Sequence, residues 1–225
     1  MWDGELMGGE YLQDGPGVFV ANHMGAIGPV GICCSLPMRL YPWVLGATVD
    51  KVEGPENVRK DFVEKVLKIK PPWSMAIARG LCQISSPLLL GLGCIPVPVT
   101  HQAQAMTFER SISLLKQGKF LLIVPEDPLG DQNPLTGIRT FKRGFLRLGE
   151  LYAQETGLRL PFYPVAIHEA GMVMVGKPIA YNPLNDPKVE RIRMVRLLAE
   201  SIKAMHIEAT ENQVVQPLFF HRKPS

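Results

Sequence analysis

The sequence predicts an α/β fold: a single layered domain in which helices flank a mostly parallel central sheet. Short apolar segments alternate with amphipathic segments of helical periodicity over most of the chain. One apolar segment, FLLIV at residues 120–124, is a continuous run, which is typical of parallel strands covered on both faces. Glycine or proline follows several of the amphipathic segments, where a helix would end.

In the first half of the chain, apolar runs and prolines mark the expected elements. GVFVA at residues 17–21 indicates a buried strand. Residues 27–36 are expected to form a short helix, because Pro29 fits a first turn and Pro37 lies beyond the end. The other elements expected here are a strand at 40–47, an amphipathic helix at 57–69, and a helical stretch at 73–92 that breaks near Pro87.

In the second half, strands and helices alternate more regularly. A strand at 94–99 precedes a helix at 103–116, which Gly118 ends, and Gly157 ends a helix at 141–155. The remaining expected elements are strands at 120–124, 162–167 and 172–175 and a long helix at 186–206. We expect one domain over residues 1–225, with a tail after about residue 211 that is loosely held.

The composition narrows the class of protein. With 46% hydrophobic and 20% charged residues, 225 residues are enough for a globular domain with a sizeable core. The net charge of +3 is too small to indicate nucleic-acid binding, although it is compatible with an anionic surface. We therefore expect no nucleic-acid partner.

The cysteines and the apolar segments bear on metal sites and location. Cys33, Cys34, Cys82 and Cys94 lack the paired spacing of a zinc site, so we expect reduced thiols, no metal and a cytoplasmic location. The first residues lack the basic and apolar regions of a signal peptide. No segment offers the about 18 charge-free apolar residues of a membrane-spanning helix.

Four blocks carry a resemblance to a known family. They are residues 20–23 (VANH), 93–97 (GCIPV), 118–126 (GKFLLIVPE) and 160–167 (LPFYPVAI). In order and spacing they resemble the glycerolipid acyltransferase family of the lysophosphatidic-acid acyltransferase type, which shows N-H-x-x-x-x-D, G-x-I-P-V-x-R, F-P-E-G-T-R-S and a P-V-x-I strand. The resemblance covers roughly residues 15–180 and implies the α/β fold of that family.

The resemblance also implies a reaction and a site. A fatty acyl group would move from acyl-CoA or acyl carrier protein, as co-substrate, to a hydroxyl of a lipid-like acceptor in phospholipid or glycerolipid metabolism, without a cofactor. His23 would be the general base, and Glu126 would position the acceptor or the imidazole. The substrate-binding candidates are Asn22, which would also support His23, Pro125, Asp127, Lys142 and Arg143.

Several family positions are changed in this chain. Gly28 stands where an aspartate would orient the imidazole, and Val99 stands where an arginine would bind an acceptor phosphate. After Glu126 the chain reads DPLG in place of GTRS, so Asp127 either supplies the lost carboxylate or only forms a turn. Two other readings stay open: a catalytically inactive lipid-binding or scaffold homologue, and a hydrolase that uses water as the acceptor.

Basic residues cluster on the expected 57–69 helix and beyond it, and Trp73 follows them. They are Lys60, Lys65, Lys68 and Lys70. This pattern is typical of a packed surface helix or of a helix that lies in a membrane interface. We therefore expect a membrane surface as a further partner, bound peripherally at its inner face.

Overall fold

The computed structural model describes residues 6–24, 27–50, 53–65, 67–98, 101–168 and 171–215. It has an α/β architecture with mostly parallel strands and flanking helices, as the sequence predicted. Two compact units make up the chain, one from residues 1–40 and 114–225 and the other from residues 41–113. No helix in the described ranges is long and apolar enough to cross a membrane.

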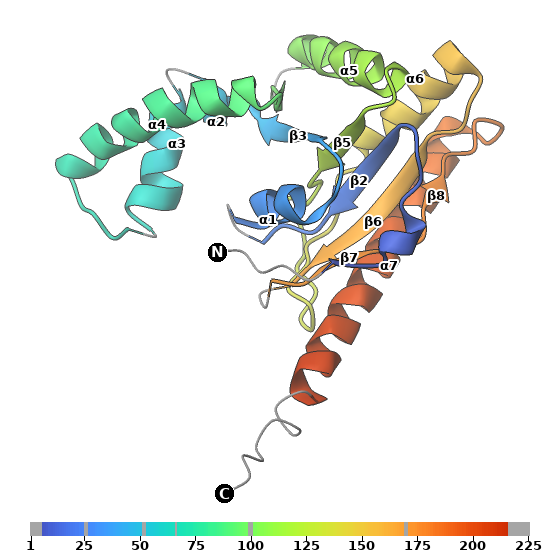
Figure 1. Cartoon of the computed structure of the whole chain (residues 1–225). Coiled ribbons are helices and arrows are strands. Elements are labelled where there is room, and N and C mark those ends of the chain that lie inside the picture. Colours follow the sequence, from blue (N-terminus) through green and yellow to red (C-terminus); the bar gives the residue numbers. More distant parts are fainter. Residues whose placement is uncertain are drawn as a thin grey trace, which may run out of the picture. The chain divides into compact units, whose positions relative to one another are not determined.

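The sheet of the first unit is built around β2. Its strands are β1 (Leu6–Met7), β2 (Gly17–Ala21), β5 (Phe120–Ile123), β6 (Pro161–Ile167), β7 (Val173–Val175) and β8 (Ile179–Ala180). β2 pairs in parallel with β5 and with β6, and it lies between them in Figure 1. β7 and β8 both pair antiparallel with β6, and β1 pairs in parallel with β7.

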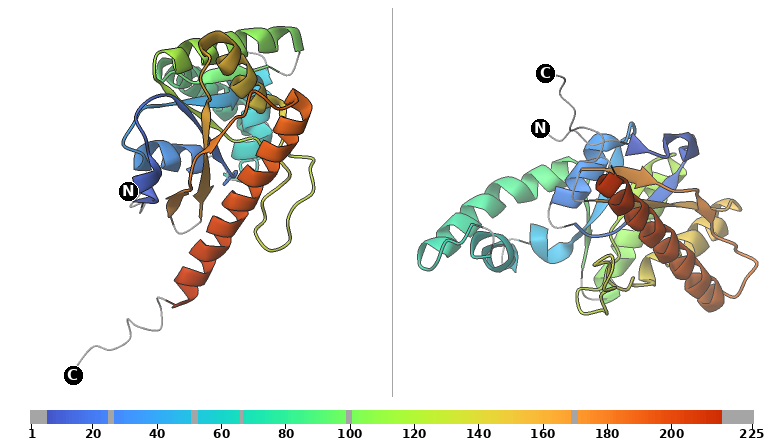
Figure 2. Two further views of the ribbon diagram at one scale, coloured as in Figure 1. Left: turned by 90° about the vertical axis from the view of Figure 1, so that its right-hand side faces the viewer. Right: turned by 90° about the horizontal axis from the view of Figure 1, so that it is seen from below.

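Helices cover both faces of this sheet, so alternate strand residues enter two separate cores. The helices of the first unit are η1 (Gly9–Tyr11), α1 (Ile27–Ser35), η3 (Gly144–Leu146), α6 (Arg147–Thr156) and α7 (Pro187–Val215). Phe19 and Tyr163 stack with ring centroids 4.9 Å apart, in the core cluster that also contains Ile32 of α1. On the other face, Phe145 of η3 packs edge-on against Phe162. α7 lies along β6 as one continuous helix (Figure 2).

The second unit combines a parallel strand pair with several helices. Its elements are β3 (Leu40–Leu45), α2 (Gly46–Val49), α3 (Glu53–Val58), the π-helical turn η2 (Arg59–Val63), α4 (Trp73–Gly91), β4 (Ile95–Val97) and most of α5 (His101–Lys116). The Trp43 indole of β3 donates to Ser111 Oγ on α5 at 3.0 Å. Thr107 Oγ1 of α5 donates to the carbonyl of Pro96 on β4 at 2.8 Å. These bonds attach α5 to both strands.

Two helix predictions in this unit are wrong in part. The helix expected at 57–69 begins earlier, at Glu53, and passes into a π-helical turn that ends at Val63. The expected break near Pro87 is absent, because α4 is continuous from Trp73 to Gly91. Pro87 lies on the exposed side of α4, where water can bond to the carbonyl that proline leaves without an N–H partner.

Other bounds also differ from the prediction. The helix expected from residue 141 begins only at Gly144, because Phe141 forms an isolated antiparallel bridge with Glu126. α7 extends past residue 206 to Val215, and residues 216–225 of the expected tail lie outside the described residues. The strand expected at 94–99 covers Ile95–Val97, and Val99 lies outside the described residues.

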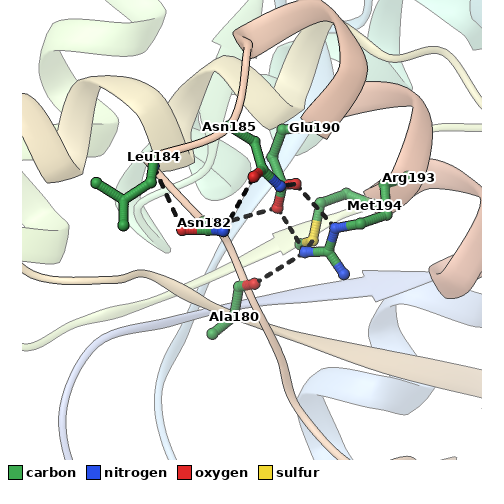
Figure 3. Close-up of polar contacts among 7 residues, drawn as sticks. All are labelled: Ala180, Asn182, Leu184, Asn185, Glu190, Arg193 and Met194. Atoms are coloured by element: carbon green, nitrogen blue, oxygen red, sulfur yellow. Dashed lines mark hydrogen bonds and ion pairs between the residues drawn. The ribbon is translucent and has the colours of Figure 1, made fainter.

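A buried carboxylate organises the start of α7 (Figure 3). Asp186 caps the helix by accepting two backbone N–H groups of the first turn. Glu190 is fully buried and accepts bonds from the Asn182 backbone N–H at 2.9 Å and the Asn185 side-chain amide at 2.7 Å. It also accepts bonds from the guanidinium of Arg193, and this cation together with the other donors lowers the pKa of Glu190 to about 2.

Glu190→Gln should lower the free energy of unfolding by about 2–3 kcal/mol at neutral pH, because it removes the buried charge and one acceptor oxygen. Folding depresses the pKa of Glu190 to about 2, so its stabilisation is present above the ordinary pKa of a glutamate. That stabilisation is lost as the pH falls from about 5 towards 2. The difference between the two proteins should therefore shrink on acidification in urea titrations.

Glu200→Gln is the matched control, since Glu200 lies on the same helix with its side chain 63% exposed and, among the described residues, paired with Arg196. It should change the stability by less than about 0.5 kcal/mol at any pH. Equal losses for the two substitutions at neutral pH would contradict a structural role for the Glu190 carboxylate.

Candidate functional site

The carboxyl ends of β2, β5 and β6 lie at one edge of the first unit's sheet, because the three strands are parallel. This is the edge where open α/β sheets bind their ligands. Asn22 and His23 follow β2 directly, and Glu126 lies three residues beyond β5. Three of the four sequence blocks, those at 20–23, 118–126 and 160–167, therefore end at the same edge.

Glu126 joins two other chain segments at this edge. Its Oε1 accepts the backbone N–H of His23 at 2.6 Å, and its Oε2 accepts the backbone N–H of Arg139 at 3.1 Å. Its own backbone pairs with Phe141 as an antiparallel bridge. The structure thus brings His23 and Glu126 together, as the sequence predicted, but the carboxylate bonds to the backbone of His23 and not to its ring.

The His23 side chain is exposed at the end of β2. Within the part of the chain that the structure describes, no residue makes a hydrogen bond or ion pair with its imidazole. The ring is therefore accessible to a substrate, and no described carboxylate fixes its orientation.

Gly28, at the position of the motif aspartate, has a packing role. It lies in the first turn of α1, and its N–H bonds to the carbonyl of Met24 at 3.0 Å. A Cβ atom there would lie 3.2 Å from Met24 Cβ and 3.9 Å from Ile167 Cγ2. The close approach of Met24 therefore favours glycine at this position, whereas the contact with Ile167 at the end of β6 is an ordinary one.

Asn22 extends the sheet by one side chain. It is buried, its Nδ2 donates to the carbonyl of Ile167 at 3.0 Å, and its Oδ1 accepts the N–H of Ile167 at 2.8 Å. The amide thus continues the pairing of β2 with β6 past Ala21 and holds the residue before His23 in place. Both polar groups of Asn22 are occupied in this way, and a contact of Asn22 with substrate stays a prediction.

The other substrate-binding candidates lie on the loop between β5 and η3. Pro125 is buried, and its carbonyl accepts the N–H of Lys142 at 2.9 Å. Asp127 forms a turn, in which its Oδ1 accepts the N–H of Leu129 at 3.1 Å, and Lys142 Nζ lies 3.5 Å from the same oxygen. Arg143 is exposed at the N-cap of η3.

These contacts decide between the two readings of Asp127. Within the described residues it interacts with the loop and with Lys142, and no contact links it to His23. The turn reading is therefore the one that the geometry favours. Lys142 and Arg143 are the exposed cations of this loop.

Sequence reasoning missed the partners of the two polar side chains at the strand ends. Glu126 uses the backbone of Arg139, and Asn22 uses the backbone of Ile167. Because every residue other than proline has a backbone N–H, no residue type signals such a partner. Only the tertiary arrangement reveals it.

No protein-family model matches the chain, and no curated protein sequence matches it. The chemistry of this edge is therefore inferred from its geometry and from the four blocks.

Glu126→Gln should loosen both backbone contacts, because the amide keeps one acceptor oxygen and turns an NH2 group towards the other N–H. A loss of about 1–2 kcal/mol in local stability corresponds to amide exchange about 5–30 times faster at His23 and Arg139. Hydrogen exchange followed by NMR measures both amides. Asp127→Asn is the neighbouring control and should leave the His23 amide unchanged; unchanged exchange in Glu126→Gln itself would show that the carboxylate does not hold β2.

Proposed function

We propose that the chain is an acyltransferase that moves a fatty acyl group from acyl-CoA or acyl carrier protein to a hydroxyl of a lipid-like acceptor. The observation that carries the proposal is the 2.6 Å bond between Glu126 Oε1 and the His23 N–H. This bond joins the VANH and VPE blocks, which resemble two motifs of the glycerolipid acyltransferases. The thioester is a co-substrate, so the reaction needs no cofactor.

The roles follow from the accessibility of each group. The exposed imidazole of His23 would take the proton of the acceptor hydroxyl while its oxygen attacks the thioester carbonyl. The tetrahedral intermediate would then expel the thiolate, which takes up that proton. Glu126 and Asn22 act as positioning residues, since their polar atoms bond to the backbone on both sides of the strand end.

The acceptor is a lipid, presented at the inner face of a membrane to which the protein binds peripherally. Lys142 and Arg143 would contact an anionic part of it, because both cations are exposed on the loop that Glu126 anchors. The ion pair of Lys142 with Asp127, at 3.5 Å on the surface, is weak enough to exchange for a ligand. Since the arginines of the motifs are missing, the acceptor need not be a phosphate ester.

One observation favours a second candidate, a catalytically inactive lipid-binding or scaffold homologue. The imidazole has no carboxylate partner among the described residues, and Gly28 has no side chain that could orient it. In other enzymes, loss of the orienting carboxylate lowers turnover by about 10⁴-fold.

Thiol release from acyl-CoA distinguishes these functions, with His23→Ala as the blank. Release that depends on both His23 and an added lipid alcohol supports acyl transfer. Release that depends on His23 and is equal without the alcohol indicates a hydrolase. Native release equal to that of the blank favours the inactive homologue.

Gly28→Asp should raise acyl-transfer turnover about tenfold to several thousandfold if His23 is a working base, because the new carboxylate can orient the ring. Gly28 has a helical backbone, so aspartate adds no left-handed strain, and a carboxylate in a first turn is favourable. Met24 must yield by a few tenths of an ångström to the new Cβ at 3.2 Å. A thermal unfolding curve therefore precedes the assay.

Gly9→Asp is the matched control, because it adds the same charge at the start of a short helix, η1, where the nearest atom to the new Cβ is Leu6 Cδ2 at an ordinary contact distance of 3.9 Å. It should leave turnover unchanged. An equal gain in both variants would mean that charge alone is responsible. No gain in a folded Gly28→Asp protein, with native turnover at the His23→Ala level, would refute the acyltransferase proposal.

A further inference from the structure

One side of α4 exposes three large apolar side chains along a stripe. Trp73 is 71% exposed, Ile84 72% and Leu88 58%. At 3.6 residues per turn these three positions lie within about 60° of arc, and they span about 22 Å along the helix. Isolated apolar residues are common on protein surfaces, but a stripe of this length that contains a tryptophan indicates a binding surface.

Contacts on an adjoining side, centred about 110° round the helix from the stripe, fix the rotation of this helix within its unit. Ser74, Ala78 and Cys82 are buried, and α4 packs there against α2, α3 and η2. Ser74 Oγ donates to Glu64 Oε1 at 2.8 Å. A Cβ atom on Gly54 of α3 would lie 3.6 Å from Cys82 Sγ, so the two helices are already in close contact. The apolar stripe therefore lies beside the face that packs against these helices, and its three side chains stay exposed.

Charge is distributed unevenly around the stripe. From residue 80 to residue 98 the sequence has no charged residue, whereas residues 59–79 contain six basic and two acidic residues. Lys65, Lys68 and Lys70 are exposed just before Trp73. Glu64 is already engaged by Arg59 and Ser74, and its hydrogen bonds with them lower its pKa, so it stays paired and ionised at neutral pH.

We propose that α4 docks in the plane of a membrane that contains anionic lipids. Trp73, Ile84 and Leu88 enter the region between head groups and acyl chains, and Lys65, Lys68 and Lys70 contact the lipid phosphates. Tryptophan suits such an interface because its amphipathic ring is favoured at the head-group level. The lysines beside it suit it too, because their long flexible side chains can keep the charge in the polar region.

The charge argues against a second copy of the chain as the occupant. A symmetric pair with antiparallel α4 helices would place each set of lysines beside the uncharged end of the other copy, where no opposite charge meets it, and a pair with parallel helices would gather both sets. Like charges brought together in this way oppose association. An anionic bilayer offers both an apolar region for the stripe and negatively charged head groups for the lysines. This surface uses none of the residues at the His23 edge, so it holds or fails independently of acyl transfer.

Vesicle co-sedimentation of the full chain tests the proposal, with phosphatidylcholine vesicles that contain or lack phosphatidylglycerol. The native protein should bind the anionic vesicles, and added salt should weaken the binding. Ile84→Ser with Leu88→Ser should weaken it at least about tenfold at every salt concentration. Lys65→Gln, Lys68→Gln and Lys70→Gln together should weaken it about a hundredfold at low salt, at about fivefold for each lysine.

Matched controls are available on the first unit. Val189→Ser with Ile192→Ser removes two exposed apolar side chains, 60% and 51% accessible, from α7. Lys119→Gln, Lys177→Gln and Lys188→Gln together remove three exposed lysines. Both control proteins should bind like the native one. Trp73→Phe should also bind, but it should lose the blue shift of tryptophan emission on vesicle addition if Trp73 enters the interface.

Three outcomes would overturn the proposal. The native protein could fail to bind anionic vesicles, or it could bind them equally well after the change of Ile84 and Leu88 to serine. Sedimentation equilibrium could instead show a dimer that this double substitution dissociates, which would assign the stripe to a second copy.

Discussion

The candidate site depends on the parallel register of β2 and β5. Val20 lies opposite Ile123, so that His23 and Glu126, each three residues further along, leave the sheet side by side. The Glu126 carboxylate then lies close enough to accept the His23 N–H at 2.6 Å. A shift of one residue in this register would also exchange the two buried faces of β2, so core packing itself fixes the contact.

Elements with strong local signals were predicted from the sequence, and elements that depend on distant contacts were not. β2 and β5 are continuous apolar runs, and the structure confirms both. β1 and β8 each contain two residues and carry no periodicity to recognise. The start of the helix after Phe141 was mispredicted because the bridge to Glu126 outweighs local helix propensity there. At Pro87 the solvent-facing side of α4 tolerates a residue that usually ends a helix.

At the site, the resemblance identified which residues meet but not how they meet. A carboxylate beside a histidine can bond to the imidazole or to a backbone N–H, and the sequence is the same in both cases. Asn22 is similar, since an asparagine before a histidine gives no sign that its amide will continue a sheet. Packing favours glycine at position 28, because Met24 limits the space that an aspartate side chain would need. The same glycine leaves His23 without the carboxylate that the family motif has at this position.

As the base of the proposed reaction, an exposed imidazole that no described carboxylate orients would depend more on the delivery of substrate. Glu126 and Asn22 hold the backbone around His23, but the ring itself gains no such restraint from the described residues. Concentrating a lipid acceptor at a surface raises its effective concentration without any change at the reacting atoms. Under the two proposals, docking through α4 of the second unit would supply the acceptor and the His23 edge of the first unit would act on it, although they share no residue. The docking helix would govern how often the acceptor reaches the base, and the His23 edge would govern what happens at each encounter.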